Sequence, residues 1–240
     1  MSEIKSVIVW GDSILKGIIS SEDLTQIRPS EINALQMAGE KLAIEINNKS
    51  IYGAHIIKLQ STQTKNLNKG LTADIALIES GTNDCDYEWN DVCTKPFSEI
   101  TQKVPLADFK RIASEMVDTS RENKITPVLV TAPDLAIPYW KEFITRGLDK
   151  EKIAQFIGHD PYVLLRNQEE YMEALRQIAK EKNVQLIDMR VEFRKTSDPM
   201  SLMCKDGVHP NIEGHKLMAD VFVKLLPEIK KEFYSCIKSN

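Results

Sequence analysis

The sequence predicts an α/β fold, a three-layer α/β/α sandwich built on a five-stranded parallel sheet. Short apolar segments rich in β-branched residues alternate with longer segments of helical periodicity, which is typical of parallel strands joined by crossover helices. Because such crossovers are right-handed, helices cover both faces of the sheet. The 240 residues, 42% of them hydrophobic, suffice for the core of one domain. We therefore expect a single domain over residues 1–240.

Five segments carry the pattern of buried strands. They span residues 6–10, 49–52, 74–79, 126–131 and 184–188. Ligands of open parallel sheets bind beyond the carboxyl ends of the strands. We therefore expect the functional residues in the loops that follow these segments.

Helical periodicity is clearest in residues 106–122, 162–182 and 211–237 and weaker in residues 31–46. The segment 211–237 has one apolar stripe, formed by Leu217, Val221, Leu225 and Ile229. Asn211 follows a proline and is expected to cap this helix. The proline-containing stretches 94–105 and 132–138 are predicted to be loops that wall the site.

Charge and composition argue against several classes of partner. The 31 basic and 35 acidic residues leave a net charge of -4, which gives no electrostatic footprint for a nucleic acid or an anionic membrane. The sequence shows neither a transmembrane span nor a secretory signal. The four cysteines lack zinc-site spacing and are too few for a disulfide scaffold. We expect a cytoplasmic protein with a small-molecule substrate, without a nucleic-acid partner and without membrane insertion.

Polar residues at three places in the chain form a potential serine hydrolase site. Ser13 follows the first strand in the run Gly-Asp-Ser, and Asp206 and His209 lie just before the last helix. A serine hydroxyl is a weak nucleophile until a base removes its proton, and a histidine oriented by a carboxylate is the commonest such base. In a tight turn, Asp206 can accept from one ring nitrogen of His209 while the other nitrogen faces Ser13. We predict a catalytic triad of Ser13, His209 and Asp206.

Attack on an acyl group also requires donors for an oxyanion. Asn83, in the run Gly-Thr-Asn-Asp after the third strand, offers a side-chain amide, and Ser13 offers its backbone N–H. Gly53 ends the second predicted strand, where the lack of a Cβ permits close approach of a ligand. We predict an oxyanion hole formed by Ser13, Gly53 and Asn83. The strand-end carboxylates of Asp12 and Asp84 are expected to hold loop N–H groups instead.

With these blocks in this order, the chain resembles the SGNH, or GDSL, hydrolase family, in its bacterial esterase and acylhydrolase branch. The resemblance rests on Gly11-Asp12-Ser13, Gly81-Thr82-Asn83-Asp84 and Asp206-x-x-His209-Pro210, which together cover almost the whole chain. It implies a flavodoxin-like sheet of five parallel strands and a reaction without cofactor or metal. It also implies the serine as nucleophile, the histidine as base and the aspartate at 206 as its orienting acid, with Gly53 and Asn83 as oxyanion donors.

Two positions depart from the family pattern, and one segment extends it. Ile14 replaces the leucine of the signature, a swap of similar volume. The block around Gly53 keeps its glycine but lacks much of the usual surrounding sequence. The run from Cys85 to Trp89 is similar to a bacterial branch of the family, and we expect Trp89 beside the acyl or alcohol pocket.

The leading hypothesis is a serine ester hydrolase that works through an acyl-enzyme. Because the sequence shows no apolar lid and no membrane-binding helix, we favour short acyl groups such as acetyl, carried by a carbohydrate. Lysophospholipase, thioesterase and transferase activities on the same triad stay open as alternatives.

Two hypotheses come from other classes. A metal-dependent phosphoesterase is motivated by acidic residues near strand ends together with His209, namely Asp12, Asp84, Asp86 and Asp206. Against it, a single aspartate ends the first strand and no glycine-rich phosphate loop is present. A binding module without catalysis is the third, although the joint presence of all the hydrolase residues argues against it.

Overall fold

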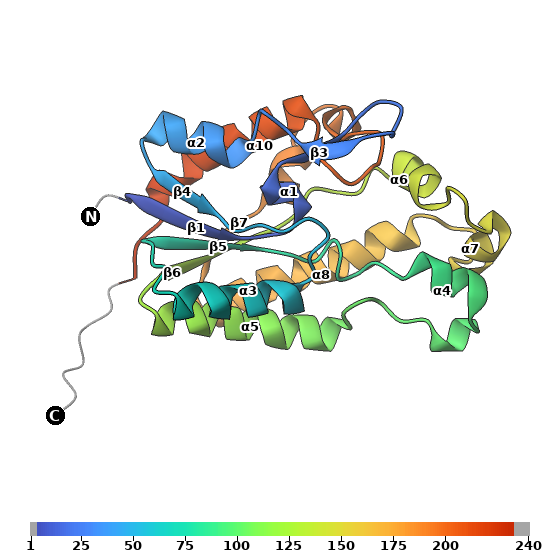
Figure 1. Ribbon diagram of the computed structural model, residues 1–240, viewed down its shortest axis with the longest axis horizontal. Coiled ribbons are helices and arrows are strands. Elements are labelled where there is room, and N and C mark those ends of the chain that lie inside the picture. Colours follow the sequence, from blue (N-terminus) through green and yellow to red (C-terminus); the bar gives the residue numbers. More distant parts are fainter. Residues whose placement is uncertain (1–3, 233–240) are drawn as a thin grey trace.

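In the computed structural model, which describes residues 4–232, a sheet of five strands lies between two layers of helices (Figure 1). Its strands are β1 (Ser6–Trp10), β4 (Glu45–Asn48), β5 (Ile75–Glu79), β6 (Thr126–Val130) and β7 (Gln185–Ile187). Their order is β4-β1-β5-β6-β7, and every neighbouring pair is parallel. This is the doubly wound order of flavodoxin-like folds. The predicted fold class is confirmed. After β4 has been added on one side of β1, the later strands β5, β6 and β7 are added on its other side, so the order of the strands switches between β1 and β5.

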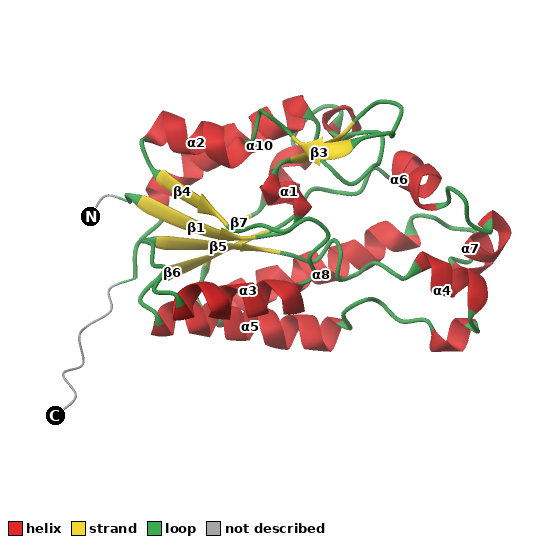
Figure 2. Cartoon of the chain, in the orientation of Figure 1, coloured by secondary structure: helices red, strands yellow, loops and turns green. Residues whose placement is uncertain are grey.

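Helices cover both faces of this sheet, as Figure 2 shows. On one face α2 (Ala34–Leu42) packs against α10 (Ile212–Leu225). The other face carries α3 (Ile56–Asn68), α5 (Leu106–Glu122) and α8 (Val163–Glu181). The three central strands are almost completely buried, which explains why their sequences read as continuous apolar runs.

A second, smaller core lies beyond the carboxyl ends of the strands. It joins α4 (Trp89–Thr94), α6 (Ile137–Ile144), α7 (Lys150–Phe156) and the first turn of α8. Figure 1 shows α4, α6 and α7 at the end of the molecule opposite the start of β1. The remaining elements are short: α1 (Ser13–Lys16), the antiparallel ribbon of β2 (Ile18–Ser20) and β3 (Ile27–Pro29), α9 (Met189–Arg194), and the 3-10 turns η1 (Phe97–Glu99), η2 (Pro199–Leu202) and η3 (Leu226–Glu228).

The prediction for the second strand is wrong in position. The strand was expected at residues 49–52, but β4 occupies Glu45–Asn48. The helix expected over residues 31–46 is accordingly shorter, because Ala43 adopts a left-handed conformation with φ 54° and ends α2 at Leu42. Ile51 still packs against the core, but from a turn that follows the strand.

The last helix is also shorter than the predicted 211–237. It ends at Leu225 because Pro227 has no N–H with which to continue the helix, and the part of the prediction from 233 onward lies outside the described residues. The predicted cap is confirmed, since Asn211 Oδ1 accepts from the N–H of Gly214 at 3.1 Å. The stretch 94–105 contains a 3-10 turn, and α6 begins at Ile137 within the predicted loop 132–138. Over residues 4–232, no helix combines the length and hydropathy required to cross a membrane.

Candidate active site

Ser13, His209 and Asp206 form a continuous hydrogen-bonded chain. The Ser13 Oγ lies 2.8 Å from His209 Nε2, and His209 Nδ1 lies 2.8 Å from Asp206 Oδ2. The serine is the first residue of α1, directly after β1, and the other two residues occupy the turn before α10. Although 196 positions separate the serine and the histidine, the structure brings all three predicted triad residues together, and each is buried.

The Asp206 carboxylate fixes both the histidine ring and the backbone that carries it. Its second oxygen accepts from the N–H groups of Val208 at 2.8 Å and His209 at 2.9 Å. Burial alone would raise the pKa of Asp206, but the hydrogen bonds from the ring and the two backbone groups outweigh burial and hold this pKa below its ordinary value. The carboxylate therefore stays ionised and can stabilise a protonated histidine.

Gly207 allows this turn to pack closely against α6 of the second core. Its carbonyl accepts from the N–H of Ala136 at 2.9 Å, and its φ is +73°. A Cβ at this position would lie only 2.3 Å from the backbone nitrogen of Trp140. The turn between Asp206 and His209 thus requires a glycine both for its conformation and for the close approach of α6.

The nucleophile turn is held from both ends. The Asp12 side chain caps α1 by accepting from the N–H of Ile14 at 2.7 Å. At the other end of α1, Asn48 Nδ2 donates to the carbonyl of Leu15 at 2.8 Å, and Asn33 Nδ2 donates to that of Lys16 at 2.9 Å. These contacts fix the position of the serine hydroxyl relative to the sheet.

Two of the predicted oxyanion donors have unused N–H groups. Within residues 4–232, neither the backbone N–H of Ser13 nor that of Gly53 meets an acceptor. Gly53 lies in the turn over residues 51–54 with φ +66°, and open space surrounds its Cα. Both N–H groups are therefore available to a ligand.

The third predicted donor is occupied. Asn83 Nδ2 donates to Asp12 Oδ2 at 3.0 Å and to the carbonyl of Ala54 at 3.1 Å. These two bonds tie Asn83 to the neighbour of Ser13 on one side and to the neighbour of Gly53 on the other. To bind an oxyanion, the amide would have to give up or share one of them.

Three buried acids underlie this arrangement. Asp84 accepts from the N–H groups of Ile56 at 2.8 Å and Gly81 at 2.9 Å, and from the Ser80 hydroxyl at 2.6 Å. Together with the capping role of Asp12, this confirms the expectation that both aspartates hold loop groups. Glu79, which sequence reasoning missed, accepts from the N–H of Asp12 at 3.0 Å. The signal in the sequence that could have identified Glu79 is its position as the one acidic residue at the end of an otherwise apolar strand.

Burial raises the pKa of each carboxyl group in this acidic cluster. It raises the pKa of Asp12 to about 6, and together with the nearby Asp12 charge it raises the pKa of Glu79 well above its ordinary value. The pKa of Asp84 is also raised, chiefly by burial.

The acids of the phosphoesterase hypothesis are not grouped as metal ligands. Over residues 4–232, no three or more His, Cys, Asp or Glu side chains form a cluster suited to an ion. Asp86, the remaining acid of that hypothesis, accepts from Trp89 Nε1 and from Lys103 Nζ, both at 2.9 Å. Each of these carboxylates thus already serves protein donors.

A small cavity of about 40 Å³ lies among residues that follow β5, β6 and β7, and reaches Asn83 and Val208, the neighbour of His209. It is lined by Thr82, Asn83, Cys85, Asp86, Leu135, Trp140, Leu164 and Val208. The predicted pocket residue Trp89 does not line it but packs edge-on against Trp140, with ring centroids 5.5 Å apart. Trp140, which the sequence suggested only as a packing residue, takes that place.

One aromatic side chain flanks the ring of His209. The ring of Tyr52 lies nearly parallel to that of His209, with a 20° interplanar angle and a 6.2 Å centroid distance. Its side chain is 53% exposed. Sequence reasoning did not single out Tyr52, whose only signal is its place directly before Gly53.

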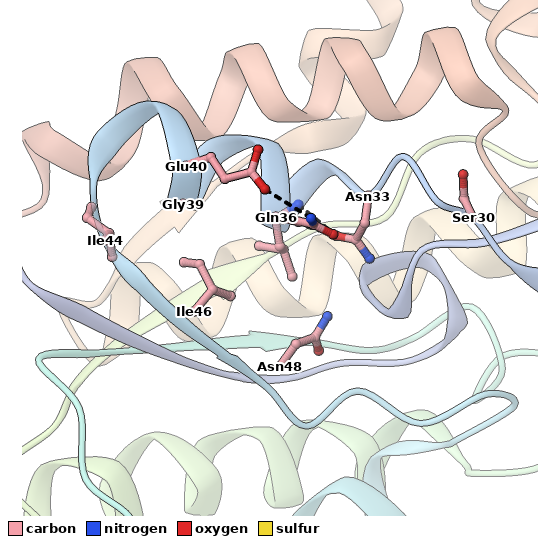
Figure 3. A pocket seen from close by; sticks show the side chains of 9 residues that line it. Ser30, Asn33, Gln36, Gly39, Glu40, Ile44, Ile46 and Asn48 are labelled. Atoms are coloured by element: carbon pink, nitrogen blue, oxygen red, sulfur yellow. Dashed lines mark hydrogen bonds between the residues drawn. The ribbon is translucent and has the colours of Figure 1, made fainter.

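A larger hollow of about 430 Å³ lies away from the triad, between α2 and the edge strand β4 (Figure 3). Its amide side chains are already used within the protein: Asn33 and Asn48 donate to the end of α1, and Gln36 donates to Glu40 at 2.9 Å. Because the smaller cavity is lined by Asn83 and by Val208, the neighbour of His209, whereas this hollow is lined by no predicted site residue, we assign the substrate to the smaller cavity.

Comparison with solved structures gives the same fold. A lipase/acylhydrolase from Enterococcus faecalis is 15% identical, with a TM-score of 0.65 over 96% of this chain and 100% of its own. An acetylxylan esterase from Geobacillus stearothermophilus, solved as a catalytic mutant, is 20% identical, with a TM-score of 0.63 over 93% of this chain and 94% of its own.

Comparison of the sequence with individual curated proteins and with family models gives two different results. No curated protein matches the chain significantly. The model of the GDSL-like lipase/acylhydrolase family matches residues 9–217, a span that includes Ser13, Asn83, Asp206 and His209. The chain therefore belongs to the GDSL-like lipase/acylhydrolase family.

Proposed function

We propose that the protein hydrolyses short-chain acyl esters, acetyl esters of carbohydrates in particular, through an acyl-enzyme on Ser13. The observation that carries this proposal is the hydrogen-bonded chain of Ser13, His209 and Asp206, together with a cavity of about 40 Å³ lined by Asn83 and by the neighbour of His209. Such a chain is the arrangement that activates a serine for acyl transfer.

The first half of the reaction transfers the acyl group to the enzyme. As Ser13 Oγ attacks the ester carbonyl carbon, His209 Nε2 takes the hydroxyl proton, and the ionised Asp206 stabilises the imidazolium. When the tetrahedral intermediate collapses, His209 returns the proton to the leaving alkoxide, and the alcohol departs. Water then attacks the acyl-enzyme by the same proton transfers and releases the acid.

The developing oxyanion would be held by the unused N–H groups of Ser13 and Gly53. Asn83 joins them when one amide hydrogen turns away from the carbonyl of Ala54, the longer of its two bonds at 3.1 Å. The bond to Asp12 then keeps the amide in place. Each such donor is worth about 3–4 kcal/mol of barrier in acyl transfer.

The size of the cavity supports a short acyl group. A volume of about 40 Å³ is only a few times the roughly 10–15 Å³ needed for one water molecule. Leu135, Leu164 and Val208 offer apolar surface to a methyl group. An acetyl group fits these dimensions, whereas the long chain of a lysophospholipid does not.

The carbohydrate half of the proposal takes support from a structural neighbour. The acetylxylan esterase was solved as catalytic mutants of a serine, an aspartate and a histidine, the residue types of the hydrogen-bonded chain described above.

We further propose a cytoplasmic location, because Cys85, Cys93 and Cys204 are all unpaired thiols, as expected in a reducing compartment.

The test is hydrolysis of p-nitrophenyl acetate, butyrate and octanoate by the wild type and by Ser13→Ala. We expect turnover by the wild type that declines steeply from acetate to octanoate and is lost in Ser13→Ala. Equal rates for the two proteins would remove Ser13 from the mechanism. No turnover by either would favour a binding module, and a preference for octanoate would refute the short-acyl assignment. Activity that disappears with EDTA and returns with Mg²⁺ would instead favour the phosphoesterase class.

A further inference from the structure

We infer that Tyr52 forms the leaving-group subsite, an aromatic platform that receives the sugar ring of the ester's alcohol half. This inference rests on the proposed function and adds the residue that selects the alcohol. Its first support is exposure. The Tyr52 side chain is 53% exposed, and within residues 4–232 its hydroxyl has no hydrogen-bond partner. A large apolar ring left open beside a catalytic group marks a binding surface.

The turn that carries Tyr52 is fixed on both sides. The N–H of Ile51 donates to the carbonyl of Gly11 at 2.9 Å, which anchors the turn to the end of the nucleophile strand. The carbonyl of Ala54 accepts from Asn83 at 3.1 Å. Because these bonds flank Tyr52, its ring is presented at a defined place beside the ring of His209, 6.2 Å away between centroids.

Sheet topology puts the acyl cavity and Tyr52 on opposite sides of the nucleophile. The cavity is lined by residues that follow β5, β6 and β7, whereas Tyr52 follows β4. Strand β1, which carries Ser13 at its end, lies between β4 and β5. An ester with its acyl group in the cavity therefore directs its alcohol toward the Tyr52 side.

The chemistry of the reaction requires the same placement. The leaving oxygen must receive its proton from His209 Nε2, so the alcohol half lies against the histidine ring that Tyr52 flanks. A pyranose ring has a flat C–H face that can cover the aromatic ring and hydroxyls that can bond to the free phenol group. Tyrosine offers this contact area at little cost in side-chain entropy. A small alkyl alcohol covers far less of the ring.

The experiment compares two acetyl esters, a peracetylated methyl pyranoside and ethyl acetate, by acetate release from the whole protein. We expect Tyr52→Ala to lower the pyranoside-to-ethyl-acetate ratio of kcat/KM about tenfold, mainly through KM. Tyr52→Phe keeps the ring face and should retain this ratio within about threefold. The matched control is Tyr162→Ala, since Tyr162 is 52% exposed but lies at the start of α8. It should leave the ratio unchanged.

The outcomes separate this inference from the proposed function. An equal loss of kcat/KM on both esters in Tyr52→Ala would mean that the ring only supports His209 and would overturn the subsite. So would an unchanged ratio, and in both cases the proposed function survives. A wild type that hydrolyses ethyl acetate but not the pyranoside would overturn the subsite and the carbohydrate part of the proposed function, but not ester hydrolysis on Ser13. Equal acetate release by the wild type and Ser13→Ala from both esters would instead refute the proposed function itself.

Discussion

Asp12 and Asn83, 71 positions apart in the chain, are joined by a 3.0 Å hydrogen bond from the amide Nδ2 to the carboxylate Oδ2. The other oxygen of the same carboxylate accepts from the N–H of Ile14 at 2.7 Å and so caps the nucleophile helix. One buried side chain therefore orients both the turn that presents Ser13 and the amide proposed to meet the oxyanion. The relative position of Ser13 and Asn83 therefore depends on this single carboxylate.

Replacing Asp12 by asparagine should accordingly reduce turnover. The variant keeps an oxygen for Ile14, but an amide then faces the Asn83 amide, and two donors cannot bond to each other. Misplacement of a reacting group by about 1 Å can cost about 100-fold in rate, and we expect Asp12→Asn to lose about that much in kcat with a smaller change in KM. Steady-state kinetics on p-nitrophenyl acetate measure this split. A change confined to KM would show that Asp12 does not position the reacting groups.

The same variant should change how stability depends on pH. Burial raises the pKa of Asp12 from 3.8 to about 6, so between these values the folded protein holds a proton that the unfolded chain has lost. Wild-type stability contributed by this group is full below pH 4 and is lost as the pH rises through 6. The free energy of unfolding of Asp12→Asn, relative to wild type, should therefore rise by about 3 kcal/mol from pH 4 to pH 7. Urea titrations across this range measure it, and parallel curves would contradict it.

Gly207→Ala tests whether the turn between Asp206 and His209 must pack closely against α6. The new Cβ would lie 2.3 Å from the backbone nitrogen of Trp140, and a backbone contact cannot be relieved by a rotamer change. We expect a loss of about 3 kcal/mol in the free energy of unfolding and a large fall in kcat. Gly147→Ala is the control: its φ is +70°, against +73° at Gly207, but nothing lies within 4 Å of its Cβ. It should cost only about 1 kcal/mol and leave kcat unchanged, and equal losses in the two variants would contradict the packing argument.

The sequence allowed the fold and the triad to be predicted because their signals are local. Buried parallel strands read as apolar runs, and Ser13, Asp206 and His209 are polar residues at sharp turns next to such runs. The position of β4 escaped prediction because a left-handed alanine, Ala43, ends the preceding helix, and alanine has no special tendency toward that conformation.

Other features depend on contacts between distant segments, which a pattern along the chain does not contain. Gln168 on α8 is an example, since it donates to Thr82 Oγ1 at 3.0 Å and accepts from the N–H of Leu135 at 3.2 Å, holding two walls of the cavity. The same holds for the finding that Trp140, and not the predicted Trp89, lines the cavity. Both tryptophans belong to one small core, and only their packing decides which of them faces the substrate.

Enlarging the cavity should relax the preference for acetyl groups. Leu164 is buried and lines the cavity, so Leu164→Ala makes room for a longer chain. One methylene in an apolar pocket is worth about 1–3 kcal/mol, and we expect the butyrate-to-acetate ratio of kcat/KM to rise about tenfold. Leu175→Ala, a similarly buried position on the same helix outside the cavity, is the matched control for general loosening. A rise of equal size in the control would show that the cavity does not set acyl length.

A buried histidine should make the protein sensitive to acid. His215 on α10 is fully buried, close to the backbone of Ile18. Burial lowers its pKa from 6.5 to about 4, so below pH 6.5 the unfolded chain gains a proton that the folded protein refuses. The stability that depends on a neutral His215 is full above pH 6.5 and is lost as the pH falls toward 4.

His215→Leu removes this titration and puts an apolar side chain at a fully buried position. Relative to wild type, we expect its free energy of unfolding to rise by about 3 kcal/mol as the pH falls from 7 to 4. This is opposite in direction to the change expected for Asp12→Asn, so the two variants can be told apart in one series of urea titrations. A constant difference between His215→Leu and wild type over this range would mean that His215 finds a proton acceptor in the folded protein.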